Sequence, residues 1–90
     1  EMCIRDRLTA VDALRNPIRA RIMLYLAEHN EATINELTRA LKEHFPLRMI
    51  NLYYHVDRLE DAELVQKTST KVRITDEGRD WLRRIGLLSD

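Results

Sequence analysis

The sequence predicts a mainly α-helical domain that contains one small β-hairpin. Two observations predict this fold class. An amphipathic helical segment, Leu47–Ala62, is followed directly by two short alternating runs that are typical of paired strands. A new helix start, T-D-E-G-R, then follows the hairpin. Together with the helical segments before residue 47, this order (α-α-(β)-α-α-β-β-α) is that of a winged helix-turn-helix.

Length and composition restrict the protein to a few classes. The chain has 90 residues, the size of one small domain. Its 15 basic residues are balanced by 15 acidic ones, so a DNA-binding surface would need the cations to gather on one face. No apolar run is long enough to span a membrane, and the single Cys cannot form an internal disulfide. We therefore expect a cytoplasmic protein that does not associate with membranes.

The first seven residues, Glu1–Arg7, read E-M-C-I-R-D-R and have the character of a translated sequencing adapter. We interpret residues 1–7 as a non-native extension and residues 8–90 as a single winged helix-turn-helix domain. Removing the extension also removes the only Cys, so a thiol function is not expected.

The first part of the chain predicts two helices. Thr9 and Asp12 have the spacing of a capping box at the start of a short helix. Asn16 is a good N-cap and Pro17 is a favoured first residue for the second helix, which we expect over Pro17–Glu28. Its core-facing positions at helical spacing are Ile18, Ile22, Tyr25 and Leu26.

The middle of the chain predicts a brief strand and two further helices. The strand is Ala32–Ile34, and Asn35 is the expected N-cap of a third helix over Glu36–Glu43. The sequence H-F-P then ends that helix, because the residue before a proline avoids helical angles. The fourth helix, about Leu47–Ala62, has a core-facing stripe made of Leu52, Val56 and Leu59.

The last part of the chain predicts the hairpin and a final helix. The hairpin, about residues 65–74, shows period-two alternation in its second strand. Thr75 is the expected N-cap of the final helix, Asp76–Ile85, and Gly86 the expected stop.

Polar side chains on the outer face of the fourth helix are candidate DNA-reading groups. In a helix-turn-helix the start of the second helix reads base edges in the major groove, where Arg pairs with guanine and Asn with adenine. The candidates opposite the apolar stripe are Arg48, Asn51, Tyr54, His55 and Arg58. Of the adjacent Tyr53 and Tyr54 we expect Tyr54 to point outward. The alternatives are a plain solvated face and, for His55, a histidine at the edge of the core.

The hairpin carries cations and hydroxyls that suit contact with the phosphate backbone along the minor groove. These candidates are Lys67, Ser69, Thr70, Lys71 and Arg73. The alternative is a solubilising ribbon whose lysines prevent pairing with another sheet edge. The acidic residues at the end of the fourth helix would be repelled by phosphate, so we expect that end to point away from DNA.

Other chemistries find no support in the sequence. There is no Gly-rich phosphate loop and no serine nucleophile elbow, so we do not expect an enzyme. The three His residues lack a Cys or a second His at metal-binding spacing. We expect no catalytic residues, no metal and no cofactor.

Four segments, in a fixed order, carry a resemblance to a known family. They are A-L-R-N-P-I-R-A-R-I-M-L-Y-L (Ala13–Leu26), T-I-N-E-L (Thr33–Leu37), Y-Y-H-V-D-R-L-E-D-A-E-L-V (Tyr53–Val65) and I-T-D-E-G-R (Ile74–Arg79). The chain resembles the ArsR-like winged helix-turn-helix transcriptional regulators. The resemblance implies a homodimeric transcription factor with a recognition helix at about residues 47–62 and a wing at about residues 65–74. It also implies that the first and last helices build the dimer.

Two departures from the family pattern affect what the resemblance implies. The family usually has Gly where this chain has Glu63, which costs about 1 kcal/mol if the backbone there is left-handed. Metal-sensing members carry a cysteine pair on a helix, whereas this chain has no Cys after residue 3. Metal sensing is therefore not implied.

The expected dimer interface joins the two ends of the domain. A chain this short buries only about 60–65% of its unfolded surface, so dimerisation would help to stabilise it. The final helix and the residues after it also carry more apolar side chains than one small domain needs. The expected interface residues are Leu8, Val11, Trp81, Leu82, Ile85 and Leu88.

The sequence thus leads to one function and one alternative. The leading hypothesis is a sequence-specific regulator of transcription that binds double-stranded DNA, and it requires the cations between residues 48 and 73 to form one electropositive surface. The alternative is a winged-helix module for protein–protein interaction within a larger assembly. The zero net charge and the acidic end of the fourth helix favour that alternative.

Overall fold

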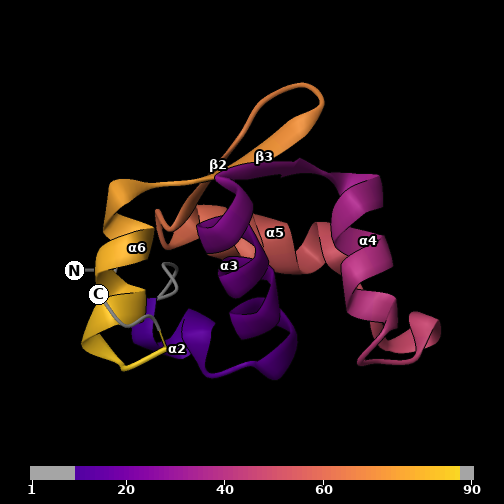
Figure 1. Ribbon diagram of the computed structural model, residues 1–90, viewed down its shortest axis with the longest axis horizontal. Coiled ribbons are helices and arrows are strands. Elements are labelled where there is room, and N and C mark those ends of the chain that lie inside the picture. Colours follow the sequence, from indigo (N-terminus) through magenta and orange to yellow (C-terminus); the bar gives the residue numbers. More distant parts are fainter. Residues whose placement is uncertain (1–9, 88–90) are drawn as a thin grey trace, which may run out of the picture.

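A computed structural model describes residues 10–87 and confirms a mainly helical fold with a small antiparallel sheet (Figure 1). The elements in chain order are α2 (Ala10–Leu14), α3 (Pro17–His29), β1 (Glu31–Thr33), α4 (Ile34–Lys42), the 3₁₀ turn η1 (Leu47–Met49), α5 (Leu52–Asp61), β2 (Val65–Lys67), β3 (Lys71–Ile74) and α6 (Asp76–Arg84). The sequence-based expectations for Glu1–Arg7, Leu8, Thr9 and Leu88 lie outside the described residues.

The hydrophobic core surrounds α3, which lies in the middle of the molecule between α4 and α6 (Figure 1). The expected core positions Ile18, Ile22 and Leu26 are buried, whereas Tyr25 is only half-buried. The apolar stripe of α5 is buried as expected, and β3 contributes Val72 and Ile74. This packing holds α5 against the body and leaves its opposite face to solvent.

The helix starts follow the capping pattern with one correction. Asn16 caps α3 as predicted, because its Oδ1 accepts the backbone N–H groups of Ile18 at 2.9 Å and Arg19 at 3.2 Å. The prediction that Asn35 caps the next helix is wrong, since α4 begins at Ile34 and Thr33 is its cap. Thr33 and Glu36 exchange side-chain to backbone hydrogen bonds of 2.9 and 3.1 Å. This capping box satisfies two free donors at once and therefore starts the helix earlier.

The predicted fourth helix is interrupted near its start. Leu47–Met49 form the single turn η1, in which the Met49 N–H donates to the Pro46 carbonyl at 2.9 Å. Ile50 is extended, with φ −92° and ψ 101°, and α5 begins only at Leu52. Residues 48 and 51 therefore precede the helix and do not lie on its face as predicted.

The sheet has three strands in the order β1-β3-β2, so the central strand is the second strand of the hairpin. The β2–β3 hairpin, hereafter the wing, projects beyond the helices at the top of Figure 1. The brief strand predicted at residues 32–34 is present one residue earlier, at Glu31–Thr33. It pairs antiparallel with β3 and places Glu31 directly opposite Arg73.

Two backbone positions fix the junction between α5, the wing and α6. Glu63 has φ 66°, so the chain does adopt the left-handed conformation there. Gly78, on the first turn of α6, has no space for a side chain. A Cβ there would lie 2.9 Å from the Met23 Cε and 3.1 Å from the Ile74 Cγ1, and closer still to the Leu64 carbonyl oxygen. Gly78 thus allows α6 to approach the start of the wing.

Candidate nucleic-acid interface

The helix-turn-helix consists of α4, the turn with η1, and α5. Leu37 and Leu41 anchor α4 in the core, and the capping box fixes its start. Figure 1 shows α4 at one end of α5, with the wing on a neighbouring side of the molecule. Helix, turn, helix and wing therefore follow one another in the order of a winged helix-turn-helix.

The polar groups at the start of α5 are open to solvent. Arg48 is exposed, and within residues 10–87 it has neither an ion-pair nor a hydrogen-bond partner. Asn51 is exposed as well, and its side chain does not cap α5. Tyr54 is half exposed, and the Arg58 guanidinium lies 5.8 Å from the centroid of its ring. Arg48 and Asn51 are thus the groups most free to meet a base edge.

His55 lies in the protein interior and not on the outer face of α5. Only 7% of its surface is exposed, and its Nδ1 lies 3.2 Å from the Arg19 Nη1. Because arginine can only donate, Nδ1 must accept, which places the imidazole proton on Nε2. Burial, and secondarily the charge of Arg19, lower the pKa of His55 below its ordinary value. The position agrees with the alternative of a core-edge histidine, and we leave His55 out of the proposed DNA contacts.

Arg19 connects this histidine to the first helices. Its Nε donates to the Ala13 carbonyl at 2.8 Å, while its Nη1 reaches His55. The guanidinium thus links the end of α2, the start of α3 and α5. The sequence shows Arg19 only as a charge off the apolar stripe, so periodicity alone does not reveal this role.

Two cations near the end of α5 are paired with carboxylates. The Arg58 Nη2 lies 2.9 Å from the Asp61 Oδ2, and this hydrogen bond raises the pKa of Arg58. The Lys67 Nζ lies 2.5 Å from the Asp57 Oδ1 and 3.9 Å from a Glu60 oxygen. The bond to Asp57 is the main cause of the raised pKa of Lys67. Asp57 and Glu60 of α5 therefore face the wing, whereas Asp61 pairs within α5.

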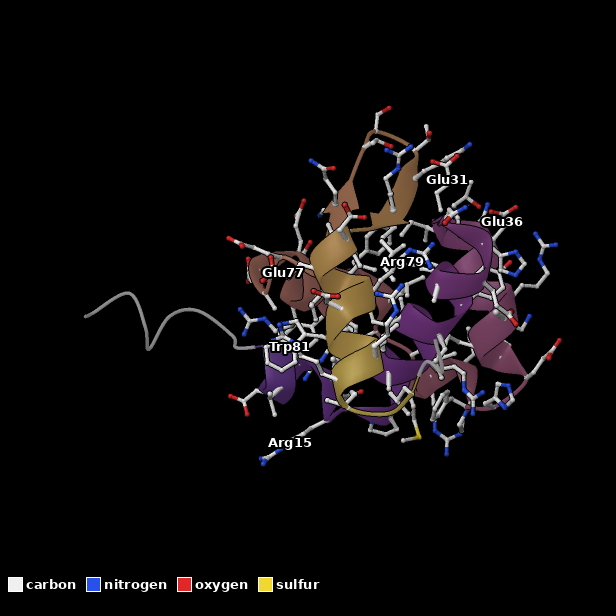
Figure 2. All side chains as sticks on the ribbon, turned by 60° about the vertical axis from the view of Figure 1, so that its left-hand side comes forward. Arg15, Glu31, Glu36, Glu77, Arg79 and Trp81 are labelled. Carbon is white, nitrogen blue, oxygen red and sulfur yellow. The ribbon has the colours of Figure 1, made fainter. Side chains whose placement is uncertain are left out.

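The other two wing cations share a single carboxylate. The Lys71 Nζ lies 3.3 Å from the Glu31 Oε2, and the Arg73 Nη2 lies 3.7 Å from the Glu31 Oε1. Glu31 reaches both because β1 pairs with β3, and Figure 2 shows it near the base of the wing. Ser69 and Thr70 are exposed at the wing tip.

The predicted electropositive surface is thus largely neutralised. Arg58, Lys67, Lys71 and Arg73 each have a carboxylate partner, and Arg48 is the exception within the proposed set. The pairs are exposed, and such pairs contribute only about 0–1 kcal/mol each. Phosphate groups can therefore compete with the carboxylates for these cations, although the net attraction to DNA is reduced.

Sequence reasoning missed the apolar character of the turn and the start of α5. Tyr53 is 67% exposed, more than Tyr54 at 50%, although only Tyr54 was expected to point outward. Leu47 and Met49 are also exposed, because the η1 turn buries none of its residues. The sequence pattern predicts a regular helix from residue 47 onward, so it does not predict that these side chains lie on an exposed turn.

The residues predicted at the dimer interface fall into four groups. Val11 and Ile85 are exposed, as is Leu87, two residues after Ile85. Trp81 is half-buried on the α2 side of α6 (Figure 2), with the Arg84 guanidinium 5.0 Å from its ring centroid. Leu82 is fully buried in the core of its own chain, so it offers no surface to a partner. Leu8 and Leu88 lie outside the described residues.

Two further properties hold across residues 10–87. No three His, Cys, Asp or Glu side chains in this range are grouped so that they can hold a metal ion. None of the helices in this range has both the length and the apolar character needed to cross a membrane.

Comparison with protein families gives one match. A family model described as a helix-turn-helix domain matches residues 14–68, which run from the last residue of α2 through α5 and β2. The second wing strand and α6 lie beyond the matched range. Comparisons with curated proteins and with solved structures found no match.

Proposed function

The chain belongs to a helix-turn-helix domain family, and on this premise we propose that it is a transcriptional regulator that binds specific sequences in double-stranded DNA. The turn before α5 and the first turns of α5 enter the major groove. The wing follows the sugar-phosphate backbone along the minor groove. The observation that carries the proposal is the pair of exposed polar residues, Arg48 and Asn51, at the start of α5 inside the matched segment.

The proposed contacts divide into base-reading and backbone-positioning groups. Arg48 and Asn51 suit guanine and adenine edges, respectively. The groups that suit the backbone are Tyr54, Arg58, Lys67, Ser69, Thr70, Lys71 and Arg73. The four cations in the backbone set must each exchange a carboxylate for a phosphate. We therefore expect affinity to depend less steeply on salt than it would for a surface of unpaired cations.

The proposal is tested with duplexes selected from a random pool. Arg48→Ala should weaken binding to the selected duplex by about 5- to 150-fold, since a bidentate contact to guanine is worth about 1–3 kcal/mol. Arg15→Ala is the matched control, because Arg15 is an exposed cation at the opposite end of the molecule from the wing (Figure 2). Equal effects of the two substitutions would refute the site. Failure to retain any duplex at low salt would refute the function.

We further propose an ArsR-like homodimer in which α2 and α6 meet their counterparts. The support is the exposed apolar surface of Val11, Ile85 and Leu87 beside the half-buried Trp81. A two-fold dimer would also place two recognition helices on successive turns of DNA. Ile85→Ser should shift the mass measured by sedimentation equilibrium toward the monomer, whereas Asp80→Asn should not. A wild-type monomer at micromolar concentration would contradict this part of the proposal.

A second function, a protein-interaction module, is favoured by a specific observation. The paired cations lower the positive charge of the surface, and the segment from Leu47 to Tyr54 exposes apolar side chains that suit a protein partner. The salt dependence separates the two functions. Binding to DNA releases counterions, so its affinity falls linearly with the logarithm of salt concentration. A chain that binds no duplex even at low salt favours the protein-interaction module.

A further inference from the structure

An exposed apolar patch lies where the proposed function places the major groove. We define it by Leu47, Met49, Tyr53 and Tyr54, whose surfaces are 58%, 57%, 67% and 50% exposed. The other exposed large hydrophobic residues in the described chain lie elsewhere, on α2 and at the end of α6. Single exposed apolar side chains are ordinary, but a group within eight residues marks a surface that meets a partner.

The patch is exposed because of how its elements pack. Ile50, directly after η1, is half-buried and packs against the core. Leu47 and Met49, on either side of Arg48 in η1, remain exposed. On α5, Leu52 and His55 are the buried neighbours of the two tyrosines. The Tyr53 side chain has no hydrogen bond or ring contact within residues 10–87, whereas Tyr54 packs edge-on against His55, with ring centroids 5.3 Å apart. Leu47, Met49 and Tyr53 are therefore the patch members most available to a ligand, and Met49 and Tyr53 flank Asn51 in the sequence.

The partner chemistry follows from what the major groove presents. Thymine carries a 5-methyl group, the one apolar group on a base edge there, and it pairs with adenine, the base that Asn contacts best. Asn51 lies between Met49 and Tyr53 in the chain, so candidate polar and apolar readers of A·T pairs come from one short exposed segment. Arg48 in the same segment gives the patch a cation for guanine or phosphate. Its charge favours DNA over an uncharged protein surface.

We propose that this patch reads the 5-methyl groups of thymine, so that the recognised sequence contains A·T pairs at positions met by Met49 and Tyr53. This inference rests on the proposed function. It adds that apolar contact supplies part of the sequence specificity, which fits a surface whose wing cations are mostly paired.

Replacing thymine by uracil in the duplex tests the inference, because it removes only the methyl group and leaves the protein and the base pairing unchanged. In the selected duplex each thymine is replaced in turn by deoxyuridine, and the dissociation constant is measured by fluorescence anisotropy. We expect at least one replacement to weaken binding about 3- to 4-fold, the effect of one buried methyl group.

Protein variants assign the methyl group to the patch. Met49→Ala or Tyr53→Ala should lose the difference between thymine and uracil at one position, whereas Tyr53→Phe and the distant Arg15→Ala should keep it. Equal affinity for all thymine and uracil duplexes would overturn the inference and leave the proposed function intact. A chain that binds no duplex would overturn both and favour a protein partner for the patch.

Discussion

Neutralising Glu31 should strengthen DNA binding. Glu31 is the shared carboxylate partner of Lys71 and Arg73, at 3.3 and 3.7 Å. At the dielectric constant of water each pair has a Coulomb energy of about 1 kcal/mol. Side-chain entropy and salt reduce the measured value for exposed pairs to about 0.2–1 kcal/mol. Glu31→Gln removes this competition with phosphate and also one negative charge from the proposed interface.

We expect Glu31→Gln to tighten binding by about 2- to 5-fold, which corresponds to about 0.5–1 kcal/mol. The slope of log affinity against log salt should become steeper by about 1, since one more cation is available to a phosphate. Fluorescence anisotropy over a range of salt concentrations measures both quantities.

Asp80→Asn is the control for Glu31→Gln, because Asp80 is also a carboxylate in an exposed pair, 3.4 Å from Arg83 on α6. It should change neither affinity nor slope. An unchanged or weaker affinity of Glu31→Gln, with an unchanged melting temperature, would refute the reasoning that Glu31 holds the wing cations back from DNA.

Three further predictions concern stability. Gly78→Ala should lower the free energy of unfolding by about 1–3 kcal/mol in urea titrations. The clash of the new methyl group with the Leu64 carbonyl outweighs a gain of about 1 kcal/mol in helix propensity. A stabilised variant would contradict the close approach of α6 to the start of the wing. Glu63→Gly should raise the free energy of unfolding by about 1 kcal/mol, since residue 63 has a left-handed backbone with φ 66°. A lower free energy of unfolding would contradict backbone strain at Glu63. The pKa of His55 is lower in the folded protein than in the unfolded chain, so the unfolded chain binds a proton more readily at this position. The free energy of unfolding should therefore fall as the pH drops through 6.5, the ordinary pKa of histidine. His55→Gln should reduce this dependence, and an unchanged dependence would contradict the assignment to His55.

The sequence was sufficient to predict the architecture because its signals are local. The Asn16 cap, the apolar stripe of α5 and the alternation in the second wing strand each act over a few residues, and each is confirmed. Thr33 and Asn35 show the limit of such signals. Both are good caps, and only the reciprocal bond with Glu36 decides between them.

The electrostatics of the candidate site were not predictable from the sequence, since they depend on pairing between distant segments. Glu31 meets Lys71 and Arg73 because β1 adds to the hairpin, a contact across 40 residues. Asp57 meets Lys67 because α5 packs beside β2. The same amino acids without these contacts would give the electropositive surface that was expected, so the proposed function now depends more on the family match and the free Arg48 than on charge.

Mapping the DNA contact surface by NMR tests the central claim most directly. Backbone amide shifts of the labelled protein are followed while the selected duplex is added. We expect the largest shifts at residues 47–58 and 67–73, with small ones on α3 away from α5. Shifts confined to α2 and α6, or no shifts at any concentration of duplex, would contradict it.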